Sequence, residues 1–304
     1  MTSLSKTLAS RPDDARPVVS LEVFPAKDDA GLAALTDLAR RLAPFRPEFI
    51  SVTYGAGGSS RDRTLATIEA LRRATAIPVA AHLTVVGASR EETMRVAERF
   101  RAAGVNHIVA LRGDPPDGES RFRPHAEGFA NAAELVAALR ARWPDVRISV
   151  AAYPETHPDS PSREADLANL KAKFEAGADE ALTQFFFDND LFADFLEQAQ
   201  AAGVTGPIHP GVMLIPNFFQ VRNFAERCQA SVPEWLKRRF AGLKGKKDRD
   251  SLTVHRMLAA AVAVEQVLDL AARGVRHFHL YTMNRPHLAE AVCRTLKGGP
   301  HGES

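Results

Sequence analysis

One pattern recurs along this chain of 304 residues: a short β-rich run, a polar or glycine-containing loop, and then a helix-forming segment. Eight such runs can be recognised, at residues 18–24, 49–54, 79–84, 107–112, 147–153, 180–186, 208–214 and 277–281. Several are nearly continuous in apolar residues, as expected for parallel strands covered on both faces. Between them, apolar residues recur at helical spacing, as at Leu35, Leu38 and Leu42. The pattern predicts an α/β protein.

The repetition of eight similar units favours a (β/α)8 TIM barrel over the alternative, an open doubly wound sheet. Glycines stand where four helices should end before the next strand, at Gly104, Gly177, Gly203 and Gly274. No linker rich in proline or serine divides the chain. We therefore expect one barrel domain over residues 1–304, with residues 1–17 as a flexible tail. Residues 232–251 form one long interruption before the last strand.

Composition excludes several classes of protein. The formal net charge is only +2, from 39 basic and 37 acidic residues, so no bias toward nucleic acid or membrane is evident. No aromatic stacking platform accompanies the basic residues between 237 and 247, which are expected to form a solvated face. Two cysteines, Cys228 and Cys293, suit a reducing cytoplasm rather than a disulfide framework. Neither a signal peptide nor a membrane-spanning apolar stretch is apparent.

Polar residues recur where the predicted strands end, and this is the end of a barrel that carries the chemistry. They are Glu22 on the first strand, Thr53 and Tyr54 on the second, His82 and Thr84 on the third, Arg112, Gly113 and Asp114 on the fourth, Tyr153 and His157 after the fifth, Gln184 on the sixth and Arg285 after the eighth. The sequence therefore predicts one functional rim.

Several of these residues also fit a structural role. Glu22 in an apolar strand is either a buried carboxylate with structural partners, or a general acid whose pKa is raised by burial. His82 between apolar neighbours can be a satisfied core histidine, and Asp114 before two prolines can be a turn residue. Gln184 stands in a run of phenylalanines, where its amide needs several partners that a ligand could provide.

The residues by themselves do not name a substrate. The glycine-rich segment 55–58 could hold a phosphate at the following helix, but it is not a GxGxxG fingerprint and implies no Rossmann site. No Cys/His spacing indicates a metal, and no Ser-His-Asp arrangement is apparent. The interpretation at this point is a barrel enzyme with an acid and an amide at one mouth.

Longer stretches of the sequence carry a resemblance. They are Ser51-Val52-Thr53-Tyr54-Gly55-Ala56 with Arg61-Asp62-Arg63-Thr64 after it, Ala81-His82-Leu83-Thr84, residues 107–114, 149–155, 165–171, 176–178 and 183–188, and Phe278-His279-Leu280-Tyr281-Thr282-Met283-Asn284-Arg285. In this order they resemble the methylenetetrahydrofolate reductase family from about residue 18 to residue 296. The likeness is to the catalytic domain of bacterial-type members.

The resemblance implies a (β/α)8 barrel that binds FAD without a Rossmann domain. NADH or NADPH would reduce the flavin, and 5,10-methylenetetrahydrofolate would then accept the hydride and become 5-methyltetrahydrofolate, which supplies methyl groups for methionine synthesis. Glu22 would be the general acid that protonates the folate, so its neutral form should exist near pH 7. Asp114 would lie near both the flavin and the pterin.

The resemblance also assigns binding residues. Those for FAD are Tyr54, Ala56, His82, Arg112, Gly113, Asp114, Ala132, Tyr153, His157, Asp166, Asn169 and Lys173. Those for the folate or the nicotinamide cofactor are Thr53, Gln184, Gln220, Phe224 and Arg285. On sequence grounds alone Phe224 would be a core residue. We expect small-molecule partners, a homo-oligomer, and no metal, nucleic acid or membrane.

The chain departs from the family pattern at two positions. Ala26 replaces a second proline after the first strand, and Asn131 replaces a tyrosine that many relatives carry, for which Phe129 could substitute as an aromatic contact to the flavin. One alternative is therefore a flavin-independent relative that transfers hydride directly from NADH. The others are a non-catalytic barrel that binds folate or flavin, and an RNA-binding or scaffolding protein.

Overall fold

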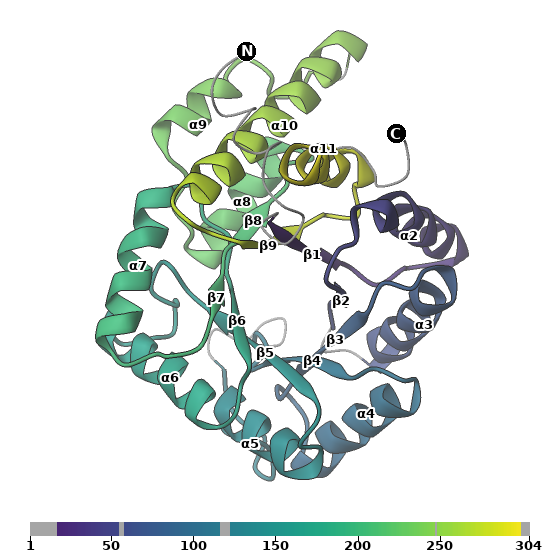
Figure 1. The fold of residues 1–304 in the computed structure, drawn as a ribbon, viewed down its shortest axis with the longest axis vertical. Coiled ribbons are helices and arrows are strands. Elements are labelled where there is room, and N and C mark those ends of the chain that lie inside the picture. Colours follow the sequence, from purple (N-terminus) through teal and green to yellow (C-terminus); the bar gives the residue numbers. More distant parts are fainter. Residues whose placement is uncertain (1–16, 55–57, 116–121, 247, 299–304) are drawn as a thin grey trace.

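The computed structural model describes residues 17–54, 58–115, 122–246 and 248–298. Within these residues the strands form one parallel sheet in the order β7-β6-β5-β4-β3-β2-β1-β9-β8, ringed by helices (Figure 1). The strands are β1 (Val18–Val23), β2 (Ile50–Val52), β3 (Val79–Thr84), β4 (His107–Leu111), β5 (Arg147–Ala152), β6 (Glu180–Thr183), β7 (Ile208–His209), β8 (Gly211–Met213) and β9 (His277–Tyr281).

The helices follow the strands in sequence and pack outside them. They are α2 (Asp29–Leu42), the short 3-10 helix η2 (Ala43–Phe45), α3 (Gly58–Ala74), α4 (Arg90–Ala102), α5 (Ala132–Arg142), α6 (Arg163–Glu175), α7 (Asn189–Ala201), α8 (Phe218–Cys228), α9 (Glu234–Arg239), α10 (Arg249–Ala272) and α11 (Pro286–Lys297). The expected interruption before the last strand contains α9 and the start of α10. The expected tail falls almost wholly outside the described residues.

The sheet closes at Pro210, which divides the predicted seventh strand into β7 and β8. β7 pairs with β6, whereas β8 pairs with β9, so this one segment joins the two edges. Pro210 has no N–H to donate, and its carbonyl accepts from His279 N–H at 2.9 Å. At Gly211 a Cβ would lie 2.2 Å from the Thr183 carbonyl oxygen, so only glycine fits the seam. The predicted (β/α)8 barrel is confirmed, with a break in one strand.

Local sequence explains where the helices begin and end. Ser89 caps α4 in a capping box with Glu92, and Asn131 caps α5 by accepting from Glu134 N–H. The four glycines predicted to end helices all have positive φ, from 79° at Gly104 to 109° at Gly177. Each of these glycines lies between a helix and the start of the next strand, at the end of the barrel opposite to the predicted functional rim.

The interior of the barrel is unusually polar. Such interiors are normally filled by bulky branched residues, but here a small apolar cluster of Phe49, Ala80, Val109 and Leu182 is accompanied by buried polar side chains. These are Ser20, His107, Ser149, Glu180, His277 and His279. The Phe49 ring contacts the ring of His107 at 4.4 Å between centroids. Two glutamates organise the polar groups, one toward each end of the barrel.

Candidate active site

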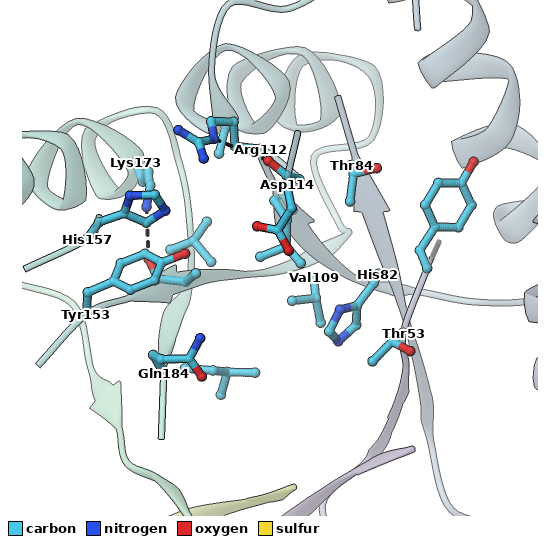
Figure 2. A pocket seen from close by; sticks show the side chains of 18 of the residues that line it. Thr53, His82, Thr84, Val109, Arg112, Asp114, Tyr153, His157, Lys173 and Gln184 are labelled. Carbon is cyan, nitrogen blue, oxygen red and sulfur yellow. Dashed lines mark hydrogen bonds between the residues drawn. The ribbon is translucent and has the colours of Figure 1, made fainter. Parts of the chain in front are cut away.

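A cavity of about 620 Å³ opens at the carboxyl ends of the strands (Figure 2). A cavity of this size suits a small molecule or cofactor. Its wall is built from residues on or just after β1 to β6 and β9, and from one face of α6. On α6, Asp166, Asn169 and Lys173 follow at spacings of three and four residues, which places them on the same face of the helix. The polar residues that were predicted at the strand ends therefore line a single cavity.

Glu22 lies on this wall with only 15 % of its side chain exposed. Its Oε2 atom is 3.4 Å from His279 Nε2 on β9 and 3.2 Å from His82 Nε2 on β3, the latter off the line of a good hydrogen bond. The register of the parallel strands produces this group, because Glu22 lies beside Tyr281, two residues beyond His279. One carboxylate therefore faces two imidazoles.

The expectation that the pKa of Glu22 is raised, so that its neutral form exists near pH 7, is wrong for the structure. Burial does raise the pKa, but the charge and hydrogen bonds of His82 and His279 lower it more, to about 2. Of the two alternatives left open by the sequence, the structure shows the carboxylate with polar partners, and its position on the cavity wall leaves the role of general acid as a prediction. At neutral pH it is ionised until something changes its surroundings.

The opposite side of the cavity carries its cations. The Nη2 atom of Arg112 lies 2.7 Å from Asp159 Oδ2, and its guanidinium stacks 4.8 Å from the Phe122 ring centroid. Lys173 is 5 % exposed and donates to the Ala151 carbonyl at 2.8 Å. Burial lowers the pKa of Lys173 to about 8. This side of the site can hold an anionic ligand.

His157 stands between the two cations and is fixed by the backbone. Its Nδ1 atom accepts from Asp159 N–H at 2.9 Å, so the neutral ring carries its proton on Nε2. Burial, and secondly the charge of Arg112, lower the pKa of His157 and keep the ring neutral at pH 7. The Tyr153 ring packs edge-on against it, with 4.5 Å between centroids. Together they offer a flat surface and a donor to a ligand.

Gln184 follows β6 directly and lies on the floor of the cavity (Figure 2). Its Oε1 atom accepts from the Phe185 N–H at 3.0 Å, and among the described residues no hydrogen bond engages its amino group. Phe224 on α8 also reaches the wall and stacks on Phe185, with 5.5 Å between centroids. The core role expected for Phe224 and the ligand role implied by the resemblance are therefore compatible.

Most of the residues proposed from the sequence line this cavity. They are Glu22, Thr53, Tyr54, His82, Arg112, Gly113, Asp114, Ala132, Tyr153, His157, Asp166, Asn169, Lys173, Gln184 and Phe224. Gln220 and Arg285 are exposed and do not line it. Ala56 lies outside the described residues.

Phe129 is not the aromatic contact that the sequence suggested. Its ring is 2 % exposed and packs under Arg90, away from the cavity wall. Phe122 is the aromatic residue that reaches the wall there, beside Arg112. Sequence reasoning also missed Asp159 and His279. The alternation in the last strand marked position 279 as inward-facing, but only closure of the barrel brings it to Glu22.

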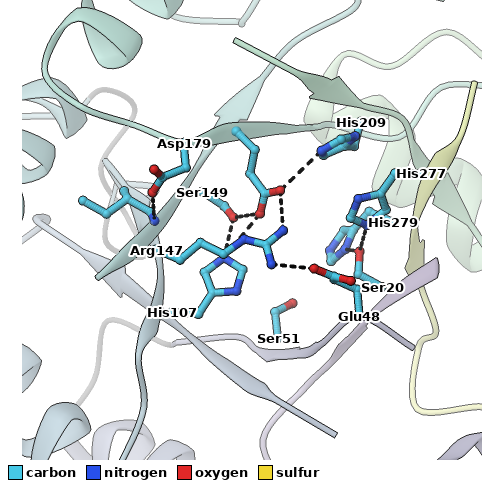
Figure 3. Close-up of polar contacts among 12 residues, drawn as sticks. Ser20, Glu48, Ser51, His107, Arg147, Ser149, Asp179, His209, His277 and His279 are labelled. Carbon is cyan, nitrogen blue, oxygen red and sulfur yellow. Dashed lines mark hydrogen bonds and ion pairs between the residues drawn. The ribbon is translucent and has the colours of Figure 1, made fainter. Parts of the chain in front are cut away.

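A second polar cluster lies in the barrel interior toward the amino ends of the strands (Figure 3). Glu180 is 2.7 Å from Arg147, 2.6 Å from Ser149 and 3.3 Å from His209. With His277 and His209 it offers three ligand atoms within 4.8 Å of one another. However, its Oε1 atom already contacts Ser149 and His107, and its Oε2 atom contacts Arg147 and His209. The carboxylate is saturated, which favours a structural role over metal binding.

Comparison with known proteins gives one consistent result. The family model of methylenetetrahydrofolate reductase matches residues 7–297. The 5,10-methylenetetrahydrofolate reductase of Salmonella typhimurium is 40 % identical over 278 residues, which cover 91 % of this chain and 90 % of that one. The Escherichia coli protein of the same name is 38 % identical with the same coverage. Methylenetetrahydrofolate reductase (NADH) 1 of Arabidopsis thaliana is 34 % identical, with 91 % of this chain and 48 % of the plant protein covered. The chain belongs to the methylenetetrahydrofolate reductase family of oxidoreductases.

Proposed function

We propose that the chain reduces 5,10-methylenetetrahydrofolate to 5-methyltetrahydrofolate in a single catalytic domain, with bound FAD that is reduced by NADH or NADPH. The product would supply methyl groups for methionine synthesis. The observation that carries the proposal is the convergence of Glu22, Asp114 and Gln184 on one cavity. An acid, a second carboxylate and an amide are the groups needed to protonate a pterin and to pair with its donor and acceptor edge.

The residues of the cavity fit FAD. Arg112 and Lys173 suit the phosphates, the Nε2–H of His157 is oriented to donate, and Tyr153 offers an aromatic edge. Asn169 and Asp166 stand on the same wall for polar contacts to the remainder of the molecule. When bound, FAD supplies the hydride transfer that no side chain can perform. The task of the protein is to bind, orient and exclude water.

Glu22 would deliver a proton to the bound folate. Burial raises its pKa, but His82 and His279 lower it by more, to about 2, so the carboxyl group is ionised in the structure. A pterin that covers the mouth removes water from the carboxylate and raises its pKa toward the value a general acid needs. The two histidines fix the position of the carboxylate and are its nearest polar neighbours. Asp114 and Gln184 would then orient the pterin against it.

A second candidate function is direct hydride transfer from NADH to the folate without a flavin. The observation that favours it is the absence of the expected aromatic contact, since Asn131 caps a helix and Phe129 is buried. The name of the Arabidopsis relative includes NADH and supports NADH over NADPH as the donor.

The visible spectrum of freshly purified protein, followed during an anaerobic NADH titration, separates the two candidates. Bound flavin absorbs near 450 nm (roughly) and is bleached on reduction. We expect a stoichiometric flavin that NADH bleaches and that methylenetetrahydrofolate reoxidises. A colourless protein that still oxidises NADH with the folate would contradict the proposal of a bound flavin and would support direct hydride transfer to the folate. A flavoprotein that the folate cannot reoxidise would overturn the substrate.

We also propose a cytoplasmic homo-oligomer that acts only on small molecules. In the described part of the chain no helix is long and apolar enough to cross a membrane. The near-neutral charge supports the absence of a nucleic-acid partner. Light scattering coupled to size exclusion measures the oligomeric state, and a monomer there would contradict this part of the proposal.

A further inference from the structure

The main exposed cation of the cavity already has an anionic partner. Arg112 forms its 2.7 Å ion pair with Asp159 while both side chains face the cavity, 25 % and 32 % exposed. The guanidinium is held from two further sides, by the Phe122 ring and by the bond of its Nε to the Gly113 carbonyl at 3.2 Å. Arg112 is therefore fixed in place, and its Nη2 atom is engaged by a carboxylate.

Asp159 is held in the same position through the loop after β5. Its backbone N–H donates to the ring Nδ1 of His157 at 2.9 Å. The backbone N–H of His157 donates to Asp166 Oδ2 at 3.1 Å. The loop therefore presents the carboxylate of Asp159 beside the ring of His157. A phosphate group that came to Arg112 would compete with this carboxylate for the Nη2 donor, which is the atom that the ion pair engages.

The balance of charges on the cavity wall increases the effect of this competition on ligand binding. Among the described residues of its wall, four carboxylates (Glu22, Asp114, Asp159 and Asp166) stand against two cations (Arg112 and Lys173). Lys173 is buried and donates to the Ala151 carbonyl, so it cannot move to replace Arg112 without losing that bond. The excess of carboxylates on this wall therefore disfavours binding of an anionic dinucleotide unless Arg112 is available to bind it.

We propose that Asp159 is a specificity-determining residue: its carboxylate competes with the diphosphate of a bound dinucleotide for the Nη2 donor of Arg112. The inference rests on the proposed function, which places FAD in this cavity. A ligand that lacks phosphate cannot displace Asp159 and gains nothing from Arg112. The ion pair thus selects for a charged dinucleotide and at the same time limits its affinity.

The size of the effect follows from the occupancy of the ion pair. An apparent dissociation constant is the intrinsic constant divided by the fraction of molecules that are competent to bind. If Arg112 is free of Asp159 in about one molecule in ten, removing the carboxylate tightens binding about tenfold. Salt screens charges that are partly exposed, so the gain should shrink at high ionic strength.

The test compares Asp159→Asn with the parent by stepwise dilution of each purified holoenzyme, with the released flavin measured by its fluorescence. We expect the dissociation constant of FAD to fall about tenfold in the variant at low salt. Asp145→Asn is the matched control, because Asp145 pairs with Arg101 at 3.2 Å away from the cavity and its loss changes the net charge equally. It should leave FAD affinity unchanged. In an Arg112→Gln background, Asp159→Asn should have no further effect.

Weaker binding by Asp159→Asn would show that Asp159 positions Arg112 for the ligand, and unchanged binding would show that the pair is irrelevant; either overturns the inference. Asp159→Ser serves as a second variant, and thermal denaturation followed by circular dichroism identifies any variant that fails to fold. A parent protein that purifies without flavin and cannot be loaded would instead contradict the proposed function. The two failures are therefore distinguishable.

Discussion

The two ends of the barrel interior each hold a buried glutamate among histidines, yet the two sites differ in what completes them. Glu180 contacts Arg147, Ser149, His107 and His209, and both of its oxygens are saturated. Among the described residues, the carboxylate of Glu22 forms its ion pairs with His82 and His279, and its remaining side faces the cavity. Similar residue types thus form a closed network at one end and an open one at the other.

The difference shows what separates a structural carboxylate from a reactive one in this fold. Hydrogen bonds from His107 and His209, and then from Arg147, hold the pKa of Glu180 far below its usual range, and Arg147 stays charged at any accessible pH. Burial opposes this shift, and the hydrogen bonds from His107, His209 and Arg147 overcome it. The partners of Glu22 are imidazoles, which can themselves gain or lose a proton. Only the open end can therefore exchange a proton with a ligand.

The largest expected effect comes from Glu22→Gln. Removing a general acid costs about 100- to 10,000-fold in the step it assists, so folate reduction should fall by that factor. Reduction of the flavin by NADH needs no proton from this residue and should remain within about twofold of the parent. Stopped-flow absorbance measures the two half-reactions separately. Equal loss in both would show that Glu22 supports binding of the flavin rather than protonation of the folate.

Glu180→Gln should have the converse effect, on stability rather than on chemistry. Removing the charge of the buried Glu180 should cost about 3 kcal/mol, because His107, His209, Ser149 and Arg147 lose their anionic acceptor, although Arg147 is 35 % exposed and keeps Glu48 as a partner. Glu48→Gln is the matched control, since Glu48 pairs with the same arginine at 2.8 Å but is 42 % exposed. That change should cost less than about 1 kcal/mol. Urea denaturation measures both.

A loss of folate reduction in correctly folded Glu180→Gln, with the stability unchanged, would reverse the assignment of the two ends. Catalytic rates should therefore be compared at a temperature where every variant is fully folded. The comparison is sharpest if Glu22→Gln loses rate with little change in stability while Glu180→Gln does the opposite.

The sequence predicted the barrel because the signal that specifies it is local and repeated. Strand runs such as 79–84 and the glycines that end helices depend on a few neighbouring residues, and these agree with the structure closely. The rim was predictable for the same reason, since parallel strands put all their carboxyl ends at one mouth. The break at Pro210 was not anticipated, although a proline within a strand run is a known sign of an interruption.

Pairings between distant strands could not be predicted in this way. The partners of Glu22 come from β3 and β9, and their contacts depend on the closed register rather than on spacing along the chain. For this reason the sign of the pKa shift at Glu22 was wrong, because burial was anticipated and the histidines were not. Asp159 was missed because a loop aspartate beside serine and prolines reads as a turn residue.

The pH dependence of stability offers a smaller test of the amino end. Burial, and then the charge of His209, lower the pKa of His277 to about 3. Below pH 6.5 the unfolded chain takes up a proton at this position that the folded chain refuses until about pH 3, so stability falls as the pH is lowered through that window. The slope from one such group is at most about 1.4 kcal/mol per pH unit. Urea denaturation between pH 6.5 and 5 should show a shallower slope in His277→Gln.

This pH range lies above the window of Glu22, whose stabilising charge is present above pH 4.5 and lost as the pH falls toward 2. Measurements between pH 6.5 and 5 therefore report on the amino end without a contribution from Glu22. An unchanged slope in His277→Gln would mean that the proton uptake belongs to other buried histidines, such as His107, whose pKa is also lowered by burial.

The smallest expected effect is that of Asp114→Asn at the open end. Asp114 is exposed on the cavity wall, so its charge is screened and its removal should slow folate turnover only about tenfold, with no measurable change in stability. Its position in the same mouth as Glu22 predicts that the loss appears with the folate and not with NADH. Asp179→Asn at the other end is the matched change, because Asp179 accepts from Ile148 N–H at 2.7 Å and pairs with Arg140. That variant should lose stability and keep its rate. Unchanged folate kinetics in Asp114→Asn would remove this carboxylate from the reacting site and leave Glu22 as the only acid there with a chemical role.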